Sequence, residues 1–245
     1  MRNIRVRSVS RTWIVAAGLA SAIVLAPAVV QAQDLTLRET TTVKGQDTPS
    51  ATFLGRTATR HNGADGMDVI VRLDAQKMIT VNNKRKTYSE MTFDDLQKMA
   101  NAATQQMENL PPEIAAKMKG MMGGGGEASV TKLGAGETIA GYATEKYHVA
   151  MGPMEVDLWV APDVVTPTMY YDAMKALAPA NPMLDMKRLY EEFKKINGTP
   201  MKRVSNIKMM GQSMTETVVV NAVDKTPIPA STFEVPAGYK LVPMK

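Results

Sequence analysis

The sequence predicts an α+β fold: a single curved antiparallel β-sheet, or half-barrel, with inserted amphipathic helices that cover its concave face. Segments with strand character recur along most of the chain, and short turn sequences separate several of them. Two longer segments instead show helical periodicity, and each has one apolar stripe that needs a surface to pack against. Because no fixed-period repeat and no long linker divides the chain, one domain is the simplest organisation.

The first 32 residues predict a secretory signal peptide. The segment from Arg2 to Arg11 holds four arginines and no acidic residue, and an apolar stretch follows from Trp13 to Val30. A small-residue pattern then predicts cleavage after Ala32, which leaves residues 33–245 as the mature domain. An uncleaved anchor is the alternative, since the stretch approaches the roughly 20 residues that span a bilayer. Pro27 suits a processing site better, so we expect a periplasmic or secreted protein with no stable transmembrane segment after cleavage.

Charge and cysteine content exclude several classes of function. The chain has 29 Lys and Arg residues against 24 Asp and Glu residues, and cleavage removes four arginines, which leaves a net charge of +1. Neither a nucleic acid nor an anionic membrane surface is therefore an expected partner. The chain has no cysteine, so thiolate zinc sites and cysteine nucleophiles are excluded, and the fold relies on packing alone.

Strand character dominates the first third of the mature chain. Residues 35–44 are rich in Thr and Val, and residues 66–74 alternate so that Val69, Val71 and Leu73 share one face. Residues 77–81 and 86–91 flank a polar tract suited to a tight turn, which predicts a hairpin.

The first inserted helix is predicted over residues 93–110. Thr92, with Asp95 three residues on, is typical of an N-terminal cap. Apolar residues follow at helical spacing: Phe93, Leu96, Met99, Ala100, Ala103, Met107 and Leu110. Pro111 and Pro112 end this helix and begin a short second one through Met118, before a glycine-rich segment, residues 120–126, that we expect to be a flexible hinge.

Two more hairpins and one more helix are predicted in the second half. The hairpins cover residues 142–161 and 201–223, and in the first of them Val156, Leu158 and Val160 alternate with polar residues and Trp159. Between the hairpins a helix opens at Asn181-Pro182 and closes at Asn197-Gly198. Its apolar stripe consists of Met183, Met186, Tyr190 and Phe193. The tail, residues 233–242, is expected to be short and extended.

Few residues could perform catalysis. The two histidines are His61, beside a turn-like Asn62-Gly63, and His148, in a predicted strand, and no Gly-x-Ser-x-Gly motif surrounds any serine. The glycine runs lack the features of a P-loop and of a dinucleotide-binding loop. We therefore expect no catalytic residue, no cofactor and no enzymatic activity, with a hydrolase acting through His148 as a minor alternative.

Methionine is unusually frequent. The chain has 20 Met residues but only 13 Phe, Tyr and Trp residues together. Methionine forms adaptable apolar surfaces, so these residues serve either as packing or as the lining of a ligand pocket. A Cu(I) site is a third interpretation, because thioether sulfur is a soft ligand and several pairs have i, i+3 spacing: Met118/Met121, Met151/Met154 and Met183/Met186. Packing explains the pairs more simply, and no metal site is predicted.

Four segments resemble the bacterial family described as domain of unknown function 4412. They are residues 77–96, residues 136–147, the strand 157–160 and the closing residues 233–239. Relatives often carry Cys after the Gly-Tyr pair, where this chain has Ala143-Thr144, so no thiol role is transferred. At the level of fold the layout is similar to periplasmic LolA/LolB-like lipoprotein carriers. This resemblance implies a LolA-like half-barrel with a helical lid that holds acyl chains, and it supplies no catalytic residue.

These observations predict an exported, non-enzymatic protein that holds a hydrophobic ligand between its sheet and a helical lid. The ligand would be a lipid, a lipoprotein acyl chain or another hydrophobic small molecule. The expected ligand-binding residues lie on the inserted helices: Met99, Ala103, Met107, Met118, Met186, Tyr190 and Phe193. The alternative is a protein-interaction or envelope-stress sensing module of the cell envelope, in which the same sheet binds an envelope protein.

Overall fold

The computed structural model describes residues 34–114, 129–151, 154–178, 186–193, 195–209 and 212–243. All of them belong to one compact unit, Ala32–Lys245. The expected signal peptide, the glycine-rich hinge, Met118 and the expected start of the second inserted helix lie outside the described residues. Among the helices of these residues, none has the length and apolar character needed to cross a membrane.

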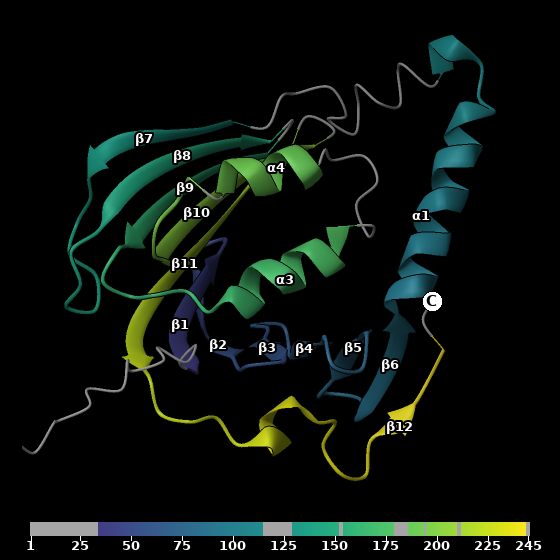
Figure 1. Cartoon of the computed structure of the whole chain (residues 1–245), viewed down its shortest axis with the longest axis horizontal. Helices are drawn as coiled ribbons and strands as arrows, with labels where there is room; N and C mark the ends of the chain where they lie inside the picture. Colours follow the sequence, from purple (N-terminus) through teal and green to yellow (C-terminus); the bar gives the residue numbers. More distant parts are fainter. Residues whose placement is uncertain are drawn as a thin grey trace, which may run out of the picture. The chain divides into compact units, whose positions relative to one another are not determined.

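In the described part of the chain, twelve strands form one curved sheet (Figure 1). Their bounds are Leu35–Val43 (β1), Gln46–Leu54 (β2), Ala58–Asn62 (β3), Met67–Arg72 (β4), Lys77–Asn82 (β5), Thr87–Thr92 (β6), Ser129–Ala135 (β7), Glu145–Met151 (β8), Met154–Ala161 (β9), Thr199–Met209 (β10), Gln212–Asp224 (β11) and Lys240–Leu241 (β12). The spatial order is β12-β6-β5-β4-β3-β2-β1-β11-β10-β9-β8-β7.

The sheet is mostly antiparallel and does not close into a barrel. Each strand pairs with its neighbour in antiparallel orientation, except that β12 runs parallel to β6. β12 and β7 form the two free edges. The predicted curved, antiparallel half-barrel is therefore confirmed at this level, as are the three predicted hairpins. Strands β2, β3 and β7 were not predicted.

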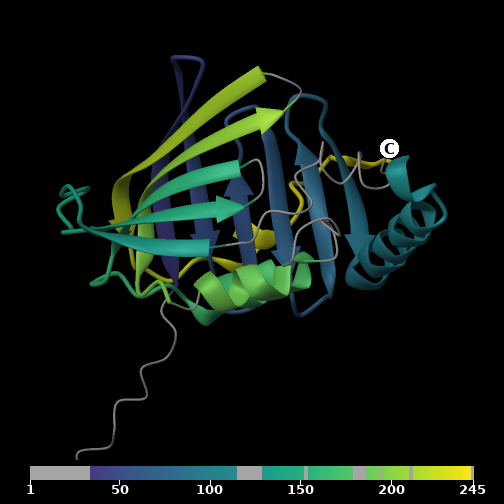
Figure 2. The ribbon, with the colours of Figure 1, turned by 90° about the horizontal axis from the view of Figure 1, so that it is seen from above.

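Two helices, α3 (Thr168–Ala176) and α4 (Met186–Phe193), lie on the concave face of the sheet (Figures 1 and 2). Met169 and Ala173 of α3 are buried against Val71 of β4, and Val69 and Leu73 pack against the same cluster. This confirms the predicted shared face of residues 66–74. Phe193 of α4 packs against a second cluster, whose buried members are Tyr147, Val149, Val156, Leu158, Val160 and Ile196.

The helix α1 (Phe93–Glu108) begins as predicted but does not cover the concave face. Thr92 Oγ1 accepts a hydrogen bond from the Asp95 backbone N–H at 3.1 Å, which forms the expected cap. The helix then continues from β6 and stands at that end of the sheet, apart from α3 and α4 (Figures 1 and 2). Helix α3, which was not predicted, lies on the concave face instead.

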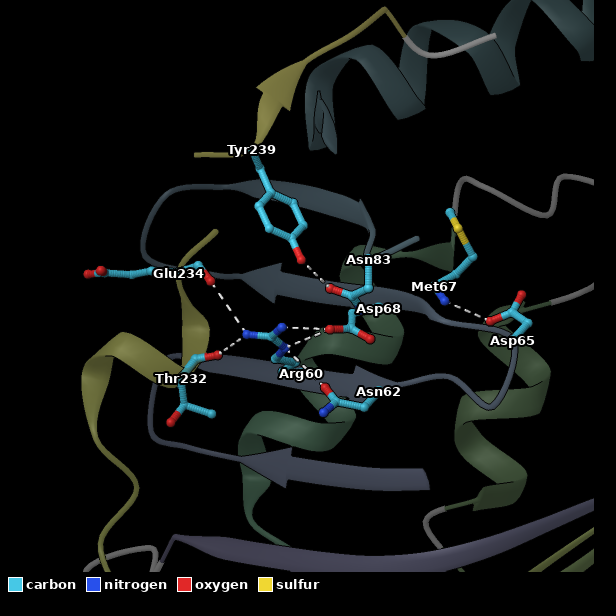
Figure 3. Close-up of polar contacts among 9 residues, drawn as sticks. All are labelled: Arg60, Asn62, Asp65, Met67, Asp68, Asn83, Thr232, Glu234 and Tyr239. Atoms are coloured by element: carbon cyan, nitrogen blue, oxygen red, sulfur yellow. Dashed lines mark hydrogen bonds and ion pairs between the residues drawn. The ribbon is translucent and has the colours of Figure 1, made fainter. Parts of the chain in front are cut away.

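The C-terminal segment 228–242, here called the C-terminal strap, covers the convex face of β2 to β6. Phe233, in the 3-10 helix Ala230–Phe233, is buried against Ala58, Ile70, Ile79 and Val81. Farther along the strap, the Tyr239 hydroxyl donates a hydrogen bond to Asn83 Oδ1 at 3.0 Å (Figure 3). The tail is thus not simply extended: it contains a helical turn and ends by pairing with β6.

Candidate ligand-binding cavity

A cavity of about 370 Å³ lies on the concave face. Tyr170 of α3 and Phe193 of α4 line it together with residues from β1, β2, β9, β10 and β11. Most of the lining is apolar and includes Leu37, Leu54, Val156, Leu158, Met201 and Val220. The volume falls within the range of about 300–1,000 Å³ that is typical of small-molecule sites.

Strand register places these side chains on one face. In antiparallel pairs, directly opposed residues point to the same side of the sheet, and successive residues alternate. Arg203 of β10 is opposite Leu158 of β9, and Ser205 is opposite Val156. All four line the cavity, so the alternation that the sequence shows over residues 154–161 is confirmed as the inward face of β9.

Alternation along β1 places the side chain of Glu39 on this face, two residues after Leu37, which also lines the cavity. The register between β1 and β11 shifts between Arg38 and Glu39: Arg38 pairs with Ala222, whereas Glu39 pairs with Val220. The extra residue on β11 keeps Glu39 beside Val220 in the cavity lining. The i, i+2 spacing of Leu37 and Glu39 in the predicted strand 35–44 was the sequence signal that could have placed Glu39 on the same face as Leu37.

Three polar side chains, here called the polar row, cross neighbouring strands beside the apolar lining: Glu39 of β1, Thr52 of β2 and His61 of β3. Thr52 Oγ1 donates to Glu39 Oε2 at 2.9 Å and lies 3.0 Å from His61 Nδ1. Because a hydroxyl has one proton, a Thr52 that donates to Glu39 must accept its second hydrogen bond from His61 Nδ1–H. Burial raises the pKa of Glu39, although Thr52, His61 and Arg203 each oppose that shift.

Two further ionisable side chains line the cavity near the polar row. The Arg203 guanidinium Nη2 lies 3.9 Å from Glu216 Oε1, and both side chains are partly exposed. Tyr170 contributes its phenol from α3, and burial raises the pKa of its hydroxyl group. The phenol therefore stays neutral at physiological pH. The cavity thus combines an apolar wall with a small ionisable region.

The residues predicted to bind ligand are not gathered in this cavity. Of those whose side chains are described, Phe193 lines it. Tyr190 is half-buried on α4, Ala103 and Met107 are half-buried on α1, and Met99 of α1 is 58 % exposed. None of these four is among the lining residues. Met118 and the side chain of Met186 lie outside the described residues, and a ligand-binding role for any of the seven stays a prediction.

His148 lies on the opposite face of the sheet from the cavity. Its Nδ1 is 2.8 Å from Asp157 Oδ1, and Lys146 Nζ is 2.9 Å from Asp157 Oδ2. Burial alone would raise the pKa of Asp157, but hydrogen bonds from His148 and Lys146 lower it. The carboxylate is therefore shared between two basic groups. Within the described ranges, no group of three or more His, Asp or Glu side chains is placed to hold a metal ion.

A family model described as domain of unknown function (DUF4412) matches residues 53–239. This chain belongs to that family. The match extends from β2 to Tyr239 of the C-terminal strap, and it begins after Glu39 and Thr52 of the polar row. No curated protein matches the chain.

Several solved structures are similar to this chain at low sequence identity. One is an uncharacterized conserved protein from Thermus thermophilus, with a TM-score of 0.47 and 6% identity, covering 87% of this chain and 91% of that one. PNGF-II has a TM-score of 0.41 and 11% identity over 87% of this chain. A chain of the Pseudomonas aeruginosa MucA/MucB complex has a TM-score of 0.37 and 11% identity over 86% of this chain. The present chain spans 32% of PNGF-II and 58% of the latter.

Proposed function

We propose that this chain is an exported, non-enzymatic protein that holds a lipid, a lipoprotein acyl chain or a similar hydrophobic ligand on the concave face of its sheet. The observation that carries the proposal is the cavity beneath α3 and α4, because its wall is mainly apolar and its volume suits a small molecule. Export follows from the expected signal peptide, with cleavage after Ala32.

The two helices on the concave face act as the cover of this site. α3 is fixed to the sheet by Met169 and Ala173, which are buried against β4. α4 reaches the sheet through Phe193 and through Glu192 Oε2, which accepts a hydrogen bond from the Val130 backbone N–H of β7 at 3.3 Å. A ligand between helices and sheet would replace water against apolar side chains from both, which favours binding by about 25 cal/mol per Å² of apolar surface.

Non-denaturing mass spectrometry tests this proposal. The mature protein is purified from the periplasm of cells that express the full chain, and bound material is then extracted with organic solvent. We expect a mature N-terminus at Gln33 and a discrete lipid adduct at near one-to-one occupancy. A clean apo mass, with no uptake of added phospholipid, would contradict the proposal and favour the protein-interaction alternative.

A pair of variants locates the ligand on the protein. Phe193→Asp places a charge in the cavity lining and should reduce lipid occupancy at least tenfold, since an unpaired charge is costly in an apolar site. Leu133→Asp is the matched control, because Leu133 is exposed on β7 and lies outside the lining. Undiminished lipid occupancy in Phe193→Asp, with far-UV circular dichroism unchanged, would place the ligand elsewhere.

A further inference from the structure

The ionisable groups in the cavity indicate which charge the head group of the ligand has. Glu39 faces an apolar lining, and its carboxylate accepts one side-chain hydrogen bond, from Thr52. In the part of the chain that the structure describes, no Lys, Arg or His nitrogen lies within ion-pair distance of Glu39. His61 and Arg203 influence it only through longer-range attraction. A half-buried carboxylate without an oppositely charged group in contact is destabilising, and a ligand that supplied a cation would reduce that cost.

The balance of charge around the cavity also favours a cation. Two carboxylates, Glu39 and Glu216, line it together with the Arg203 guanidinium, and Arg203 is already placed 3.9 Å from Glu216. Lys202 also contributes to the lining, but its ammonium group is held by Glu137 Oε1 at 2.6 Å and lies over the Trp159 ring. Among the charged groups of the described lining, Glu39 is therefore the one that no oppositely charged side chain contacts.

The surroundings of Glu39 suit an ammonium group attached to an apolar chain. Tyr170 and Phe193 present aromatic rings in the same lining, and cations are attracted to the faces of such rings. Beyond the polar row, Val156 and Leu158 continue the wall as an apolar surface. A head group and a chain would thus each contact side chains of matching chemistry.

We propose that the cavity binds an amine-bearing amphiphile, whose ammonium group pairs with Glu39 and whose hydrocarbon chain lies against Val156, Leu158 and Phe193. This inference rests on the proposed function, and it adds the chemical class of the head group. Glu39 is the specificity-determining residue, while Thr52 orients its carboxylate by the 2.9 Å hydrogen bond.

Three probes of equal chain length test the head group: dodecylamine, dodecanol and dodecanoate, each kept below its micelle-forming concentration. Binding to the mature protein at pH 7 is measured by isothermal titration calorimetry. We expect dodecylamine to bind about tenfold more tightly than dodecanol, in line with a hydrogen bond to a charged group, and dodecanoate to bind most weakly. Tighter binding of dodecanoate, or equal binding of all three, would overturn the proposal.

Variants assign the effect to Glu39. Glu39→Gln keeps an acceptor for Thr52 and for a ligand hydroxyl but removes the charge, so dodecylamine should lose about tenfold in affinity and dodecanol less than about threefold. Retained dodecanol binding also shows that the variant is folded. Glu216→Gln is the matched control. It should lower the affinity for dodecylamine by less than about threefold, because Arg203 already lies beside that carboxylate. A larger loss of affinity than in Glu39→Gln would overturn the assignment. If no probe binds, the proposed function fails as well, whereas binding of dodecanol without any preference for dodecylamine defeats only this inference.

Discussion

Arg60 and Asp68 form an ion pair on the convex face, with Nη2 and Oδ2 2.6 Å apart and side chains that are only 12% and 3% exposed. The same guanidinium donates through Nη1 to the carbonyl oxygen of Thr232 at 2.9 Å (Figure 3). One side chain therefore joins β3, β4 and the C-terminal strap. In the closing segment of the family resemblance, residues 233–239, Phe233 and Tyr239 also contact this face, which lies opposite the cavity.

Arg60→Ala should lower the free energy of unfolding by about 3–5 kcal/mol, because it leaves Asp68 buried without its partner. Denaturant unfolding followed by the fluorescence of Trp159 measures this change. Lys77→Ala is the control, since Lys77 pairs with Glu90 at 2.9 Å in a more exposed position, and its cost should stay below about 1 kcal/mol. If both variants lost the same free energy of unfolding, the ion pair of Arg60 would not contribute to holding the C-terminal strap against the sheet.

Gly198→Ala should destabilise the protein by roughly 2–4 kcal/mol, the combined cost of a left-handed backbone and of overpacking. Gly198 has φ of +118°, and an added Cβ would collide with the Ala161 carbonyl group and lie 2.8 Å from Pro162 Cα. Gly45→Ala, at φ +76° with open space around it, should cost about 1 kcal/mol. Thermal unfolding compares the two, and a smaller loss for Gly198→Ala would contradict the packing seen here.

Glu39→Gln should stabilise the unliganded protein at pH 7 and have less effect near pH 4. Burial raises the pKa of Glu39 above its ordinary value of 4.5 in the folded state, so the folded protein holds this proton more tightly than the unfolded chain. Stability is therefore lost as pH rises from 4.5 through the raised pKa. The groups that interact with this carboxyl are Thr52, His61, Arg203 and Tyr170. Denaturant unfolding at both pH values checks this. If Glu39→Gln changed the free energy of unfolding by the same amount at pH 4 and at pH 7, this account would be contradicted.

Thr92→Ala should cost about 1 kcal/mol of stability through loss of the cap of α1, yet leave dodecanol binding unchanged. The reason is that Thr92 Oγ1 accepts from the Asp95 N–H, whereas no described residue of α1 lines the cavity. Calorimetric titration of the variant checks this. If binding is lost while the sheet stays folded, α1 contributes to the site, as the positions of Met99, Ala103 and Met107 on its apolar stripe predict.

Local patterns were sufficient to predict the hairpins and the start of α1. The β5–β6, β8–β9 and β10–β11 hairpins join neighbouring segments, so their turn sequences and alternation carry the needed information. β2 and β3 were not predicted because most of their residues are polar, such as Arg60 and His61 of β3. In addition, Pro49 lies inside β2, and proline is uncommon within strands. They are strands because the sheet pairs them on both sides.

Helix α3 and the cavity required tertiary information. The segment that forms α3 follows Pro167 and contains the adjacent aromatic residues Tyr170 and Tyr171, which gave no clear helical stripe. Its helix is stabilised by burial of Met169 and Ala173. The polar row likewise arises from register across three strands, β1, β2 and β3. Helical periodicity could identify Phe193, but the rest of the lining comes mainly from strands that are distant in sequence.

The C-terminal strap also determines when the folding of the sheet can be completed during synthesis. Arg60 and Thr232 are 172 positions apart, and Phe233 fills the apolar cluster formed by β3 to β5. During synthesis those strands emerge long before the residues that shield their outer surface. Contacts between distant segments form slowly, and uncovered strands are prone to aggregation. The N-terminal half of the sheet therefore depends on the last residues of the chain, and a truncated protein that ends before Phe233 would expose an apolar surface even with every strand from β1 to β11 present.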